Sequence, residues 1–185
     1  CKAALFAVSD LLDSEKVDIP VMISGTITDA SGRTLSGQTV EAFLHSISHV
    51  KPIAIGLNCA LGVSQMRPWL SDLSKASSTY VFAFPNAGLP NEFGEYDQTA
   101  IQMAKEIREF AKDGLVNLVG GCCGTTPEHI KAISDHVKNI TMNADLSRFR
   151  RHRRRVGRPR FSWLVRAMEK AYYWRRKRKK LRSQT

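Results

Sequence analysis

Residues 115–127 read LVNLVGGCCGTTP, and this stretch contains a complete transition from strand to helix. Leu115–Val119 is a short, mostly apolar run, which is typical of a buried strand. A glycine-rich turn follows it. The Thr-Thr-Pro at the end predicts the start of a helix, because a hydroxyl cap followed by proline in the first turn is a common helix N-terminus. We therefore expect a βα unit whose helix continues to Val137.

The same order of strand and helix occurs three more times before this unit, after one leading helix. Short apolar runs next to prolines predict the strands, and apolar residues at a spacing of three and four predict the helices. The expected strands are Val21–Ile23, Ile53–Leu57 and Tyr80–Phe84. The expected helices are Ala3–Glu15, Thr39–Val50, Gln65–Lys75 (with Pro68 in its first turn) and Tyr96–Lys112.

Four βα units of about 30 residues each predict an α/β fold with a parallel sheet. Two architectures are compatible with them: half of a (βα)8 TIM barrel, or an open doubly wound sheet. Polar and cysteine-bearing segments follow every strand, and barrels build their sites on these loops. No Gly-x-Gly-x-x-Gly fingerprint follows a strand, which weakens a nucleotide-binding function. These features favour the half barrel.

Composition excludes several classes of protein. The chain has 185 residues, of which 43% are hydrophobic and 24% charged, values that are ordinary for a globular domain. No run approaches the roughly 20 apolar residues that a membrane-spanning helix needs. The four cysteines come without a recognisable signal peptide, which argues against a disulfide-stapled secreted protein and favours a cytoplasmic one.

The net charge of +11 is concentrated at the C-terminal end of the chain. Residues 147–185 hold 17 Lys and Arg and a single acidic residue, whereas residues 1–146 hold 11 basic and 16 acidic residues. We predict a βα domain over 1–142 and a basic, partly helical or disordered tail over 143–185. The tail would suit nucleic acid or an anionic surface as a partner. Alternatively, it is a fused segment without a selected role.

Three cysteines lie just after two of the expected strands. Cys59 closes the second strand, and Cys122 and Cys123 follow the fourth. All three would lie at the same edge of a parallel sheet, where three thiolates leave one coordination position of a tetrahedral ion open, as in catalytic zinc sites. Two alternatives remain at this point: small buried hydrophobic residues, or a labile disulfide between the adjacent cysteines.

Several segments together resemble the homocysteine-binding module of cobalamin-dependent methionine synthases, a part of the wider homocysteine S-methyltransferase family. The likeness extends over residues 1–139. It implies the C-terminal half of a (βα)8 TIM barrel, with four further βα units expected before residue 1. The segments that carry it are Val21–Asp29, Arg33–Thr39, Gly56–Gly62, Pro85–Pro90 and Gly120–Pro127.

The resemblance implies a set of metal ligands and a reaction. Cys59, Cys122 and Cys123 match the zinc ligands of that family, and Asn86 matches a position that fills the fourth site when substrate is absent. The implied reaction is methyl transfer to homocysteine, giving methionine. The implied donor is methylcobalamin, bound and recharged from methyltetrahydrofolate on separate modules. Zinc would hold the substrate sulfur as a nucleophilic thiolate.

Polar residues near the strand ends are candidates for holding the ammonium and carboxylate groups of the amino acid: Ser24, Thr26, Asn58 and Glu95. Alternatively, such residues only cap turns and helices. We expect the chain to be inactive alone unless two copies pair or another chain completes the barrel. Two other functions stay open at this point: a nucleic-acid-binding protein acting through its tail, and a non-functional chimera.

Overall fold

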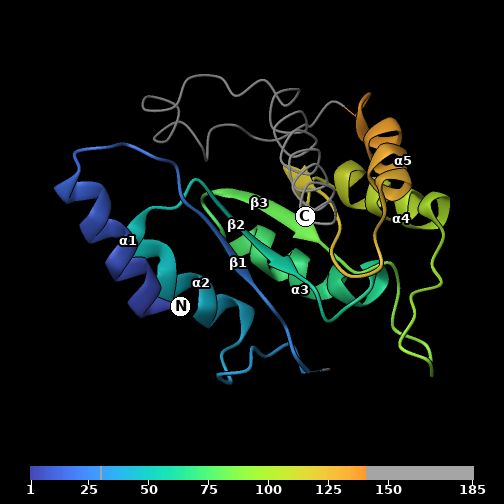
Figure 1. The fold of residues 1–185 in the computed structure, drawn as a ribbon, viewed down its shortest axis with the longest axis horizontal. Helices are drawn as coiled ribbons and strands as arrows, with labels where there is room; N and C mark the ends of the chain where they lie inside the picture. The colour runs from blue at the N-terminus through green and yellow to red at the C-terminus, as the bar shows by residue number, and fades with distance from the viewer. Residues whose placement is uncertain (30, 141–185) are drawn as a thin grey trace, which may run out of the picture. The chain divides into compact units, whose positions relative to one another are not determined.

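The computed structural model describes residues 1–29 and 31–140 (Figure 1). The predicted basic tail, 143–185, therefore lies outside the described residues. Helices and strands alternate along the chain, as expected. The helices are α1 (Lys2–Ser14), α2 (Val40–Ile47), the short 3₁₀ helix η1 (Ser48–Val50), α3 (Val63–Ala76), α4 (Ala100–Lys112) and α5 (Pro127–Val137); the strands are β1 (Met22–Gly25), β2 (Ala54–Asn58), β3 (Tyr80–Phe84) and β4 (Leu118–Val119).

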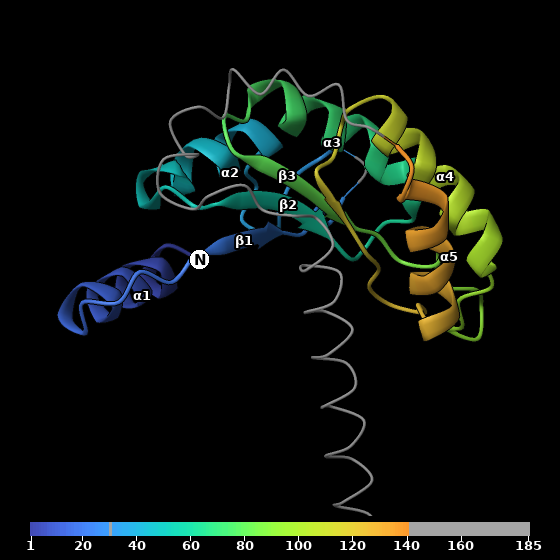
Figure 2. The same cartoon turned by 90° about the horizontal axis from the view of Figure 1, so that it is seen from above.

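The four strands form one parallel sheet in the order β1-β2-β3-β4, which is also their order along the chain. A doubly wound sheet would reverse direction at a switch point, and this sheet has none. Figure 2 shows α2, α3 and α4 along one face of the curved sheet. A sheet wound in one direction with its helices on one face is the arrangement of a barrel wall. The predicted half barrel is confirmed.

The register assigns alternate residues to the two faces of the sheet. Ile23, Ile55 and Val81 lie opposite one another on neighbouring strands and belong to the buried core beneath the helices. Gly56 and Phe82 are paired on the other face. A Cβ at Gly56 would lie within 3.0 Å of the ring and carbonyl oxygen of Phe82, so this position needs glycine for the two strands to pair.

The third helix begins two residues earlier than predicted. Gly62 is its N-cap and Val63 its first residue, so Pro68 is the sixth residue and not part of the first turn. The earlier start adds Val63 to the helix, and this residue is buried in the core. Burial of this kind is worth roughly 1.5–3 kcal/mol for each large apolar side chain, which offsets the backbone hydrogen bond that the proline cannot donate.

The fourth helix begins four residues later than predicted. A capping box ends the preceding loop: the backbone N–H of Gln102 donates to Thr99 Oγ1 (3.4 Å), and the N–H of Thr99 donates to Gln102 Oε1 (3.0 Å). Since this box marks the true N-terminus, Tyr96 lies in the loop after β3 rather than on the helix.

The last strand is shorter than predicted, and only Leu118 and Val119 pair with β3 as strand residues. Asn117 attaches the preceding segment differently. Its backbone N–H donates to the Val81 carbonyl (2.7 Å), and its side-chain Oδ1 accepts from the Val81 N–H (2.8 Å). None of the helices in residues 1–29 and 31–140 has the length and apolarity that crossing a membrane requires.

Candidate metal centre

Cys59 follows the last residue of β2, at a sharp turn of the backbone. Its φ is 59°, and that of Ala60 is 57°, so two successive residues with side chains adopt left-handed conformations. The turn is held by the N–H of Cys59, which donates to the Phe84 carbonyl (3.1 Å), and by the N–H of Leu61, which donates to the Cys59 carbonyl (2.7 Å). Left-handed backbone costs roughly 1–2 kcal/mol per residue, and such strain is concentrated at functional sites.

The two adjacent cysteines lie on the loop after β4, which is bonded to the loop after β3. The N–H of Cys122 donates to the Pro85 carbonyl (2.8 Å). The N–H of Cys123 donates to the side-chain oxygen of Asn86 (3.1 Å), and its carbonyl accepts from the Ala87 N–H (2.9 Å). Three hydrogen bonds therefore fix the second cysteine-bearing loop relative to β3.

The two strand ends bring the three sulfur atoms together. All three Sγ atoms lie within 4.8 Å of one another; the Cys59–Cys123 distance is 3.4 Å and the Cys122–Cys123 distance 3.9 Å. Three thiolates at the usual Zn–S length of about 2.3 Å in a tetrahedron have their sulfurs about 3.8 Å apart. Disulfide sulfurs are about 2.05 Å apart, and all the cysteines are free. The donor set therefore fits a tetrahedral ion.

Asn86 lies beside this cluster and is buried, with 2% of its surface exposed. Its side-chain oxygen accepts from Cys123, and its own N–H donates to the Leu61 carbonyl (2.9 Å). The residue thus joins both cysteine-bearing loops. The amide oxygen has a second lone pair that the Cys123 bond does not use.

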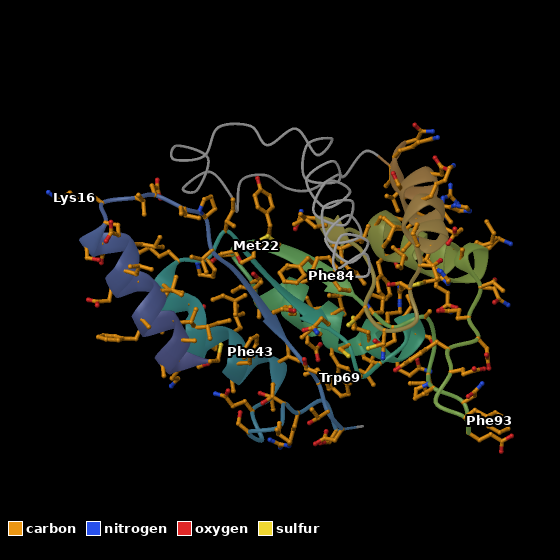
Figure 3. The ribbon with its side chains drawn as sticks, in the orientation of Figure 1. Lys16, Met22, Phe43, Trp69, Phe84 and Phe93 are labelled. Carbon is orange, nitrogen blue, oxygen red and sulfur yellow. The ribbon has the colours of Figure 1, made fainter. Side chains whose placement is uncertain are left out.

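Three of the four residues predicted to hold the amino acid are joined by hydrogen bonds. Ser24 Oγ donates to Asn58 Oδ1 (2.6 Å), and Thr26 Oγ1 donates to the same oxygen (3.3 Å). Because Asn58 precedes Cys59 directly, this polar group begins one residue from the sulfur cluster. The loop after β1, which contains Thr26, packs on α3. A Cβ at Gly32 in this loop would lie within 3.0 Å of the Trp69 ring (Figure 3).

The fourth predicted residue, Glu95, lies in a turn of the loop after β3. Its N–H donates to Asn91 Oδ1 (2.9 Å), and its carbonyl accepts from the Asn91 N–H (2.8 Å). Phe93, at the tip of the same turn, is 80% exposed (Figure 3). The structure thus places Glu95 in an exposed turn and not in the hydrogen-bonded group around Asn58.

A comparison with family models gives a match over most of the described chain. The model described as homocysteine S-methyltransferase matches residues 1–137. The chain belongs to the homocysteine S-methyltransferase family.

Two solved structures of homocysteine methyltransferase MmuM from Escherichia coli have a similar fold. The oxidized form is 20% identical, with a TM-score of 0.51, and the match covers 71% of this chain and 40% of that one. The apo form is 23% identical, with the same TM-score, and the match covers 71% of this chain and 45% of that one. The chain therefore spans less than half the length of these methyltransferases.

Two residues near the cysteine cluster were not predicted as site residues. Tyr96 packs on the cysteine loop: a Cβ at Gly124 would lie within 3.0 Å of its Cβ. Partial burial and the nearby Cys123 side chain raise the pKa of Tyr96. His129 caps α5 by accepting from the Thr126 N–H, and it is buried, with 9% of its surface exposed. The Gly-Thr-Thr-Pro stretch predicts the helix cap. The contacts of Tyr96 and His129 with loops distant in sequence become visible only in the folded structure.

The thiols of this centre differ in acidity. Burial, together with the interactions with Cys59 and Cys123, raises the pKa of Cys122 to about 11. Burial acts on Cys59 too, but the N–H of Ala60 and the thiols of Cys123 and Cys122 outweigh it, so the pKa of Cys59 is lowered. Cys59 is therefore the readier thiolate of the two in the metal-free protein.

We expect iodoacetamide to alkylate Cys59 about tenfold faster than Cys122 in metal-free protein near neutral pH, because only the thiolate reacts. The rate at Cys122 should keep rising with pH after that of Cys59 has levelled off, since the folded-state pKa of Cys122 is the higher. Time-resolved peptide mass spectrometry measures both rates. The difference should disappear in urea, and equal rates in the folded protein would show that the two environments do not differ.

Proposed function

We propose that this chain holds one zinc ion on Cys59, Cys122 and Cys123 and binds homocysteine for methylation to methionine. The convergence of three sulfurs from two strand ends carries the proposal. Membership of the homocysteine S-methyltransferase family supports the substrate and the reaction. When bound, zinc would stabilise the substrate thiol as a thiolate at neutral pH.

The three cysteines supply both geometry and charge for this function. Their sulfurs would occupy three corners of a tetrahedron around the ion and leave the fourth for an incoming ligand, as in catalytic zinc sites. Three thiolates carry more negative charge than one divalent ion neutralises. This excess charge would leave electron density on a substrate sulfur held by the ion and so favour its attack on a methyl carbon. Asn86 would occupy that corner through its amide oxygen when substrate is absent.

The polar group around Asn58 would hold the other end of the amino acid. Its Oδ1 is used by two hydroxyl donors, so the Nδ2 group is oriented and keeps two N–H donors for a carboxylate. The hydroxyl oxygens of Ser24 and Thr26 keep lone pairs for an ammonium group. Glu95 lies outside this group, in the exposed turn of the loop after β3, so its contact with the ammonium group stays a prediction.

The methyl donor proposed for this site is methylcobalamin carried on a separate module. The chain spans less than half the length of the matched methyltransferases, so other parts of the barrel would complete the pocket. Substrate binding is therefore the property to test before turnover. A cytoplasmic location and the nucleic-acid or anionic partner of the tail stay predictions, the latter outside the described residues.

Cobalt(II) substitution tests this function, because thiolate-to-cobalt absorption reports the ligands directly. We expect the full chain to take up one Co(II) and its spectrum to change, with saturation, when L-homocysteine is added. L-Homoserine, which has oxygen in place of sulfur, should leave the spectrum unchanged. A second measurement tests the methyl donor. The absorption of methylcobalamin shows whether it loses its methyl group, first with L-homocysteine and then with L-homoserine.

Failure to bind the metal would remove the proposal altogether. Metal binding with identical responses to homocysteine and homoserine would support the proposed metal site but contradict homocysteine as the substrate. A response to homocysteine without demethylation of methylcobalamin, even with the rest of the barrel supplied as a second chain, would remove the donor.

A further inference from the structure

His129 is a buried polar residue in the first turn of α5, beyond the cysteine loop. Its Nδ1 lies 3.2 Å from the backbone N of Thr126 and 2.9 Å from Thr126 Oγ1. Its Nε2 lies 2.9 Å from the carbonyl oxygen of Gln98, which is 31 residues away in sequence. One imidazole therefore joins the end of the cysteine loop to the segment before α4.

The partners of His129 determine which of its ring nitrogens carries the proton. A backbone N–H only donates, so Nδ1 must accept from Thr126 and carries no proton. A carbonyl oxygen only accepts, so Nε2 must carry the proton and donate it to Gln98. The tautomer with its proton on Nε2 satisfies both partners, and the two hydrogen bonds are directional.

These bonds complete a closed ring of hydrogen bonds and backbone segments that includes Cys123. The Gln98 N–H donates to the Ala87 carbonyl (3.3 Å), and the Ala87 N–H donates to the Cys123 carbonyl (2.9 Å). Three residues further along the chain, Thr126 donates to His129, which returns to Gln98. Gln98 is held in turn by α4, because its Nε2 donates to Glu106 Oε1 (2.7 Å).

We propose that His129 is a positioning residue that fixes the Cys122–Cys123 loop against the loop carrying Asn86 and so sets the distance of Cys123 from Cys59. The inference rests on the proposed metal function. Without the Nε2 bond, the cysteine loop keeps its helix cap but loses one of its connections to the segment before α4. The distances between the three Sγ atoms then vary over a wider range, and fewer of these arrangements suit a tetrahedral ion.

Two substitutions separate this role from helix capping. Asparagine places an oxygen near the position of Nδ1, so His129→Asn keeps an acceptor for Thr126 but does not reach Gln98. Glutamine places its amide nitrogen near the position of Nε2, so His129→Gln keeps the donor to Gln98 and loses the cap. His136→Asn is the matched control, since His136 bonds within α5, to the Ala132 carbonyl.

We expect His129→Asn to weaken zinc binding about tenfold, measured by competition with a chromogenic chelator, and to alter the Co(II)–thiolate absorption. His129→Gln should melt at a lower temperature yet bind zinc within about threefold of wild type. His136→Asn should match wild type in affinity. Amide hydrogen exchange of the metal-free protein gives a second readout: His129→Asn should speed exchange at Ala87, and His129→Gln should not.

Wild-type zinc affinity together with unchanged amide exchange in His129→Asn would overturn the inference. A loss of zinc affinity in both His129 variants that only follows their loss of thermal stability would overturn it too. Absence of zinc binding by the wild-type chain would instead overturn the proposed function. In that case the exchange rates at Ala87 still test the positioning role.

Discussion

Cys59→Ala is expected to abolish stoichiometric zinc binding. The variant removes one of three sulfurs that lie within 4.8 Å of one another and leaves the centre with only two protein thiolates. Loss of an outer partner already costs roughly 10–100-fold in metal affinity, so loss of a ligand should exceed that. Purified wild type should hold about one zinc per chain under reducing conditions, and the variant close to none, as measured by elemental analysis. Cys122→Ala should behave in the same way.

The controls separate a lost ligand from a lost fold. Cys1→Ala removes an exposed thiol outside the cluster and should keep wild-type zinc content. Alanine at residue 59 meets the same left-handed φ as cysteine does, so the backbone strain of the turn does not change. The metal-free forms of wild type and Cys59→Ala should therefore melt at similar temperatures. Wild-type zinc content in Cys59→Ala, with the fold intact, would mean that these sulfurs are not the ligands.

The elements that the sequence predicted best are those whose limits are set locally. Tyr80–Phe84 was predicted with its observed bounds, because a continuous apolar run ends at a proline. The start of α4 was missed because the apolar spacing extends back to Tyr96, whereas the Thr99–Gln102 capping box begins the helix later. The length of β4 depends on how Asn117 bonds to Val81, a contact between distant segments that no local pattern contains.

The same distinction applies to the site. The meeting of Cys59 with Cys122 and Cys123 follows from topology, since all the strands of a parallel sheet end at the same edge. The contacts that hold this cluster were not predictable in that way. His129 and Gln98 are joined through a ring nitrogen and a backbone carbonyl, and a carbonyl leaves no signature in a sequence.

Gly124→Ala should destabilise the chain more than any other single methyl group added to the cysteine loop. Gly124 has a φ of 75°, and a Cβ there would lie within 3.0 Å of the Cβ and ring of Tyr96. The left-handed backbone alone costs roughly 1–2 kcal/mol with a side chain. Overpacking adds about 1–3 kcal/mol, because the nearest obstruction is a Cβ that cannot rotate away. Urea denaturation of the metal-free protein measures the sum.

Gly94→Ala isolates the first of these two costs. Gly94 has a φ of 79°, nearly the same as Gly124, but a Cβ there would meet nothing within 4 Å. Its destabilisation should therefore stay at about 1–2 kcal/mol, and its zinc affinity should stay at the wild-type value. In Gly124→Ala the clash must move either Tyr96 or the residue next to Cys123, so zinc affinity should fall together with stability. Equal destabilisation of the two variants would show that Tyr96 does not pack against the cysteine loop, because backbone conformation alone would then account for both.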